Sequence, residues 1–96
     1  MSFSFHPEAE EELSKSVDYY EAIESGLGYE FSIEVYEAIC RAVEFPKSWT
    51  LIEGSIRRSM VTRFPYGVLY TEDEGEIYIL AVMHLHRNPY YWRHRV

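Results

Sequence analysis

The residues best suited to binding an anion or moving a proton lie after Ile77. From that position onward the sequence has no acidic residue. Guanidinium groups bind carboxylates and phosphates, and a histidine titrates near neutral pH. This concentration of basic groups therefore favours contact with an anion or an acidic protein over a role in solubility alone. The arginines and histidines of this segment are Arg87, Arg93, Arg95, His84, His86 and His94.

Two features of this C-terminal segment have a structural and a functional interpretation. His84 ends an apolar run, where a histidine is more often held by a structural hydrogen bond than used as a general base. Tyr91 and Trp92 can pack on a sheet or stack on a base. We expect both rings to anchor the segment and to leave the arginines that follow free to meet an acidic partner. The candidate partner-binding residues are Trp92, Arg93 and Arg95.

The sequence predicts no metal site and no cofactor. His6 and His94 are far apart, and no histidine or cysteine spacing of the zinc-binding kind is present. The single cysteine, Cys40, has no partner for an internal disulfide and stands beside Ile39 and Ala42 in a helical pattern. It is expected to be a small buried hydrophobic residue.

Length and composition predict a single globular domain over residues 1–96. The hydrophobic fraction of 47% and the aromatic fraction of 17% suffice for one core. No apolar run is long enough to cross a bilayer and no signal peptide is visible, so we expect a cytoplasmic protein with no membrane partner. The net charge of −7 is unevenly divided, because residues 1–53 hold twelve acids and three bases, whereas residues 54–96 hold four acids and six bases. Most of the acids are expected on the solvated faces of helices.

Two amphipathic helices are expected in the first half, after a short strand over Ser2–Phe5. Pro7 suits the first turn of a helix, and the apolar residues that follow recur every three or four positions as far as Ile23. A glycine-containing break at residues 25–28 separates a second apolar stripe, which stops before Pro46. Short connections make such helices antiparallel neighbours. The apolar stripes are Ala9, Leu13, Val17, Tyr20 and Ile23, then Phe31, Val35, Ile39 and Ala42.

Three consecutive strands are expected in the second half. Residues 56–62 alternate loosely, and a turn or bulge at residues 64–67 leads to a strand over residues 68–70. The acidic sequence ending in Gly75 is typical of a hairpin turn. The run Ile77–Met83 is almost continuously apolar, as expected of a central strand covered on both faces.

Several motifs occur together in an order that is specific, although each motif alone is weak. In this order and at this spacing they resemble the RelE/ParE superfamily of toxin–antitoxin toxins, and the resemblance covers essentially the whole chain. In the second half they are Arg57-Arg58 with Arg63-Phe64-Pro65-Tyr66 and Tyr70, then Ile79–His84, then Arg87–Arg93. In the first half they are Phe5, Pro7 and Ala9, then Asp18-Tyr19-Tyr20, then Gly26-Leu27-Gly28 with Phe31.

This resemblance implies an α+β fold with the order βααβββ, in which a two-helix hairpin packs on an antiparallel sheet. It also implies the toxin of a type II toxin–antitoxin module of the plasmid-stabilisation kind, with a cognate antitoxin as its partner. We expect the antitoxin segment to enter an exposed groove between the helices and the sheet, because the aromatic residues outnumber what so short a chain needs for its core. The resemblance leaves a homodimer open.

The superfamily has two toxic activities. RelE-like members are metal-independent mRNA interferases that cut ribosome-bound mRNA by attack of the 2′-OH on the adjacent phosphodiester, which requires proton transfer and cations at the phosphate. ParE-like members are gyrase inhibitors, which bind DNA gyrase and need no nuclease site. The residues that would serve the first activity are Arg58, Arg63, His84, Arg87 and Tyr91.

The residues favour the nuclease activity less than the gyrase activity. Arg58 and Arg63 are equally well explained as ion-pair partners of helix carboxylates such as Glu34 or Glu37. Gly67 stands where RelE-like nucleases often carry an arginine, and an acidic protein is poorly suited to the ribosome surface. Leu85 follows His84 where those nucleases often have a basic pair. A binding module that keeps the fold and the partner contact without toxicity is the alternative function.

Overall fold

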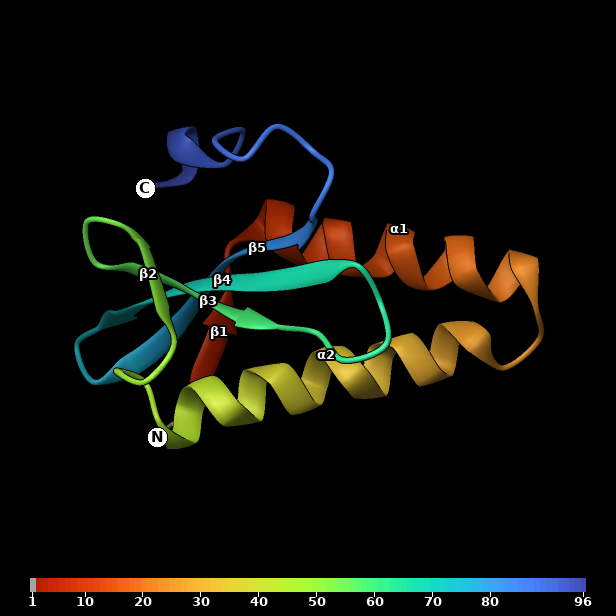
Figure 1. Ribbon diagram of the computed structural model, residues 1–96, viewed down its shortest axis with the longest axis horizontal. Coiled ribbons are helices and arrows are strands. Elements are labelled where there is room, and N and C mark those ends of the chain that lie inside the picture. The colour runs from red at the N-terminus through yellow and green to blue at the C-terminus, as the bar shows by residue number, and fades with distance from the viewer. Residues whose placement is uncertain (1) are drawn as a thin grey trace.

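The computed structural model describes residues 2–96, and its secondary structure begins and ends as follows. The elements are β1 (Phe3–Phe5), α1 (Pro7–Ile23), α2 (Leu27–Glu44), β2 (Thr50–Glu53), β3 (Ile56–Met60), β4 (Tyr66–Asp73), β5 (Glu76–His84) and the short 3₁₀ helix η1 (Arg93–Arg95). Figure 1 shows α1 and α2 as a hairpin whose connecting end projects beyond the sheet. Neither helix of this part of the chain is long and apolar enough to span a membrane.

The helices form where the apolar stripes predict them. The side chain of His6 caps α1 by accepting a hydrogen bond from the Glu8 N–H at 3.1 Å, and Pro7 occupies the first turn. The turn between the helices needs a left-handed residue, which Gly26 supplies with φ of 89°. The second helix ends just before Pro46, because proline disfavours the helical conformation of the residue that precedes it. The predicted helical hairpin is therefore confirmed.

Gly28 sets how closely the two helices approach. A Cβ atom at this position would lie 2.5 Å from the Val17 carbonyl oxygen and 2.9 Å from the Cβ atom of Glu21. Both neighbours belong to α1, and the first is a backbone atom that cannot rotate away. Gly28→Ala should therefore force the helices apart and lower the free energy of unfolding by about 2 kcal/mol, despite the gain in helix propensity. Chemical denaturation measures the change.

The control for this substitution is Ser14→Ala, at an exposed position of α1. We expect it to change the free energy of unfolding by less than about 0.5 kcal/mol. A Gly28→Ala variant as stable as wild type would show that the helices can separate without cost.

The sheet has the order β1-β5-β4-β3-β2, and it differs from the expected meander in two respects. The residues Thr50–Glu53 add the edge strand β2, which pairs with β3 in a hairpin closed by Gly54 at φ of 55°. The strand β1 pairs with β5 in parallel, so the sheet is mixed and not purely antiparallel. The reason is topological: the helical hairpin returns the chain to the far edge of the sheet, and the meander then runs back until its last strand lies beside β1. The predicted α+β class is confirmed.

The sheet is covered on both faces, as the apolar run of β5 predicted. One core lies between the helices and the sheet, and a second lies under the C-terminal segment, which crosses the opposite side of the sheet from α2 (Figure 1). In β5, Ile77 and Ile79 enter the first core, whereas Leu80 and Ala81 both enter the second. An irregularity in the β4–β5 register at this point allows two successive residues to face the same side.

Candidate functional site

Trp92 fixes the C-terminal segment to the sheet. Its side chain is completely buried in the second core with Leu69, Leu80 and Met83. The indole N–H donates a hydrogen bond to the Pro89 carbonyl at 2.7 Å, so the ring's polar atom is satisfied inside the core. The Trp92 ring is therefore anchored on the sheet, as expected. A completely buried ring has no surface to offer a partner.

Glu12 of α1 holds the same segment by charge. Its carboxylate accepts two hydrogen bonds from the Arg95 guanidinium, both at 2.9 Å, and one from the backbone N–H of Val82 at 3.1 Å. It also accepts from Arg87 at 3.3 Å and from the Tyr91 hydroxyl. The side chains of Glu12 and Arg95 are only 13% and 4% exposed. One helix carboxylate thus accepts hydrogen bonds from three side chains of this segment, Arg87, Tyr91 and Arg95.

Tyr91 is held in its protonated form within this cluster. Burial, together with the hydrogen bond that it donates to Glu12, raises the pKa of the Tyr91 phenol well above its usual range. The Arg87 guanidinium lies 3.7 Å from the centre of the Tyr91 ring, in a cation–π contact. His84 lines one pocket with Glu12 and Arg87, but its Nδ1 accepts a hydrogen bond from the His86 N–H at 3.1 Å. His84 therefore has the hydrogen-bond partner that a structural role requires.

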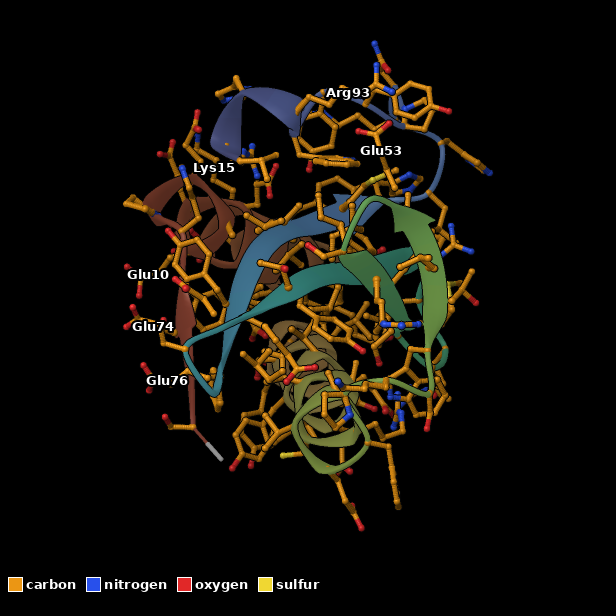
Figure 2. All side chains as sticks on the ribbon, turned by 90° about the vertical axis from the view of Figure 1, so that its left-hand side faces the viewer. Glu10, Lys15, Glu53, Glu74, Glu76 and Arg93 are labelled. Carbon is orange, nitrogen blue, oxygen red and sulfur yellow. The ribbon has the colours of Figure 1, made fainter. Side chains whose placement is uncertain are left out.

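The expectation that Arg93 and Arg95 remain free for a partner is wrong. Arg95 is the buried partner of Glu12, and Arg93 forms a two-pronged ion pair with Glu53. Figure 2 shows Arg93 and Glu53 side by side, where the C-terminal segment meets the end of β2. The physical reason is the excess of acids, because folding brings this basic segment against carboxylates of α1 and β2. Arg93 itself remains 54% exposed.

His94 joins the same network at its exposed rim. Its Nε2 lies 2.8 Å from a carboxylate oxygen of Glu8, on the first turn of α1. The hydrogen bond with His94 lowers the pKa of the Glu8 carboxyl below its usual value. A depressed carboxyl pKa stabilises the fold above the value of the unfolded chain, and this contribution is lost as pH falls through the folded value.

Arg58 and Arg63 lie away from this cluster. Arg63, in the turn after β3, has φ of 73° and pairs with two carboxylates of α2, Glu30 at 3.1 Å and Glu34 at 3.8 Å. Arg58 lies opposite Leu69 in the β3–β4 ladder, on the face of the second core. Within residues 2–96 neither arginine shares a hydrogen bond or an ion pair with the residues around Glu12. The five candidate catalytic residues are therefore not assembled at one point.

Glu12, the centre of the cluster, was not among the residues predicted from the sequence. It was one of twelve acids in the first half, most of which were expected on solvated helix faces. A signal was present, since Glu12 stands three residues after Ala9 and next to Leu13, at the margin of the apolar stripe of α1. Its partner 83 residues away gives no local signal.

A shallow apolar pocket of about 210 Å³ lies where α1, α2 and β1 meet. It continues into an exposed stripe of α2 formed by Tyr29, Ile33 and Tyr36, whose spacing of four and three residues places them on one helix face. This is the structural counterpart of the expected groove between helices and sheet. The pocket is lined by Phe3, Phe5, Leu13, Ser32, Val35, Tyr36 and Ile39.

Comparison with known proteins identifies the fold. No family model matches the sequence, and no curated protein matches it significantly. The structure is similar to a chain of the chromosomal ParDE TA (toxin–antitoxin) system from P. aeruginosa, with a TM-score of 0.62 and 18% sequence identity. The alignment covers 88% of this chain and 96% of that chain. The similarity confirms the α+β fold that the sequence motifs implied.

Proposed function

We propose that this protein is the toxin-type component of a toxin–antitoxin module, and that it acts by binding a protein and not by cutting mRNA. In the cytoplasm a cognate antitoxin would neutralise it, and DNA gyrase is the target that the ParE-like resemblance suggests. The fold shared with a chain of a ParDE system supports the module. The occupation of three candidate nuclease side chains, Arg63, Arg87 and Tyr91, by carboxylates supports the mode of action.

The observation that carries this proposal is the Glu12 cluster. A nuclease must present guanidinium and hydroxyl groups to a phosphate that carries extra charge in the transition state. Here Arg87, Tyr91 and Arg95 already donate to one carboxylate. A phosphate would have to displace an anion that also accepts the backbone N–H of Val82. Protein recognition needs no such displacement.

The apolar pocket supports the antitoxin contact. Tyr29 and Tyr36 are 69% and 55% exposed, and Ile33 is 40% exposed, so one helix face presents several large apolar side chains to solvent. A contiguous exposed apolar surface of this kind is typical of a protein-binding site. We infer that the antitoxin covers this stripe and the adjoining pocket.

Regulated expression in a bacterial host tests the mode of action. We expect growth arrest with intact translated mRNA and reduced DNA supercoiling, both relieved by co-expression of the small protein encoded by the neighbouring reading frame. Tyr91→Phe should arrest growth as wild type does, because it removes only the hydroxyl that Glu12 already engages. Primer extension on a reporter mRNA, together with a supercoiling assay, supplies the readouts.

The opposite result is specific for a nuclease. Cleavage of the reporter mRNA that falls about 100-fold in Tyr91→Phe, while the melting temperature is kept, would contradict the proposal and assign a proton-transfer or positioning role to that hydroxyl. Expression without growth arrest, combined with antitoxin binding, would instead favour the non-toxic binding module.

A further inference from the structure

The arginines of this protein divide into two groups by their partners. The chain has sixteen acidic and nine basic residues, so carboxylates are in excess. Arg63, Arg87, Arg93 and Arg95 each have a carboxylate within 4 Å. The remaining three have no carboxylate partner among residues 2–96: Arg41, Arg57 and Arg58. In an acidic chain, arginines without counter-ions require an explanation.

These three arginines gather around Trp49 at one edge of the sheet. The Trp49 indole donates to the Arg41 carbonyl at 3.0 Å, and the Trp49 carbonyl accepts from the Arg57 guanidinium at 2.9 Å. Arg41, in the last turn of α2, donates to the Met60 carbonyl at 2.9 Å. The guanidinium groups of Arg41 and Arg57 are thus positioned by backbone oxygens, which fix geometry without cancelling the charge.

Arg58 is positioned by packing. Its aliphatic stem lies against Gly67, where an added Cβ atom would come within 2.9 Å of the Arg58 Cδ. The Nε atom of Arg58 is buried and has no hydrogen-bond partner among the described residues. A buried donor without a partner carries a free-energy cost.

Arg41 and Arg58 line the same open pocket, with a volume of about 530 Å³. It lies where β3 continues beyond the paired part of β2. Besides the two guanidinium groups it presents an indole ring, a thioether and hydroxyl groups. We call it the arginine pocket, and its lining residues are Arg41, Trp49, Thr50, Arg58, Met60 and Thr62.

We propose that the arginine pocket binds the carboxylates of an acidic protein segment that also carries an apolar side chain. The inference rests on the proposed function in taking the partner to be a protein. Fixed guanidinium groups bind carboxylates in two-pronged contacts, and arginine and tryptophan are the residues that contribute most at protein interfaces. Trp49 and Met60 supply the apolar contact beside them.

Charge favours a protein over a nucleic acid at this pocket. Nucleic-acid affinity depends on many phosphate contacts made by unpaired basic groups. The net charge of this chain is −7, and Arg63, Arg87, Arg93 and Arg95 are paired with its own carboxylates. A short acidic segment needs only the few guanidinium groups that this edge offers.

Fluorescence anisotropy tests the proposal with the purified chain. The probe is a fluorescein-labelled octapeptide with a central leucine flanked by glutamates, compared with the same peptide carrying glutamines. We expect the glutamate peptide alone to bind, and Arg41→Gln and Arg58→Gln each to weaken it about tenfold. The matched control is Lys15→Gln, which removes the same charge from an exposed lysine paired with Glu11 and should leave binding unchanged.

Three results would overturn the proposal: no binding of the glutamate peptide, equal loss in Lys15→Gln, or tighter binding of a labelled single-stranded RNA octamer through the same two arginines. If Arg58→Gln fails to fold, Arg41→Gln still decides. The assay is independent of the growth experiment. If the chain is toxic but does not bind the peptide, only this inference is contradicted. If it binds the peptide but is not toxic, this inference stands and the proposed toxicity is contradicted.

Discussion

Replacing Glu12 with alanine should lower the free energy of unfolding by about 3–5 kcal/mol, although the residue lies on a helix rich in exposed acids. The substitution removes the two-pronged carboxylate partner of the Arg95 guanidinium, which is only 4% exposed, and leaves it with the half-exposed Glu8 at 3.4 Å. It also removes the acceptor of the Val82 N–H and of the Tyr91 hydroxyl. Removing the main partner of a buried charge is among the most destabilising changes that a single substitution makes. For a chain of this length the melting temperature should fall by more than roughly 10 °C.

Two comparisons isolate the cause. Glu11→Ala, at the preceding position, removes a carboxylate that is 61% exposed and pairs with Lys15, so it should cost less than about 1 kcal/mol. The double variant Glu12→Ala with Arg95→Ala should be more stable than the sum of the single changes predicts, because neither buried charge remains. Additive changes in that cycle would show that the two residues stabilise the fold independently.

Trp92→Ala should lower the free energy of unfolding by about 3–5 kcal/mol, as Glu12→Ala does, but for a different reason. The ring is completely buried between the C-terminal segment and the sheet, so its removal leaves a cavity in the second core. Beyond the lost stability, the segment should detach from the sheet. Thermal unfolding measures the first effect, and amide hydrogen exchange of residues 85–96 measures the second.

Val96→Ala is the matched control for this truncation. Val96 is 73% exposed, and its replacement should change stability by less than about 0.5 kcal/mol. If Trp92→Ala unfolded no more readily than Val96→Ala, the second core would not depend on the C-terminal segment.

The fold was predictable to the extent that its elements carry a periodic pattern. The stripes of α1 and α2 and the apolar run of β5 gave these elements correctly, because each buries several side chains at a regular spacing. The strand β2 was not predictable, since Thr50–Glu53 has no apolar alternation and lies largely exposed. The parallel pairing of β1 was equally hidden, because three residues do not encode the direction of their neighbour.

The residue types of the candidate site were predictable, but which carboxylate pairs with which arginine was not. The basic C-terminal segment was recognised, and so was the packing role of its rings. Which carboxylate would meet Arg95 depends on the placement of α1 beside β5, a tertiary contact that local pattern does not contain. Arg63 illustrates the intermediate case, since pairing with helix carboxylates such as Glu34 was one of two equally weighted interpretations, and Glu34 is one of its partners.

The position of Glu12 between β5 and the C-terminal segment also bears on how this chain folds. Its hydrogen bonds join residues 70 and 83 positions apart, and β1 reaches its only strand neighbour across the length of the chain. Contacts of such long range close large loops. The chain loses this conformational entropy before the stabilising contacts of the sheet have formed. The helical hairpin can form early from local contacts, whereas the sheet acquires both its edge strand β1 and its second core late. Folding should accordingly be slow for a chain of this size, and the helices alone should not persist as a stable unit.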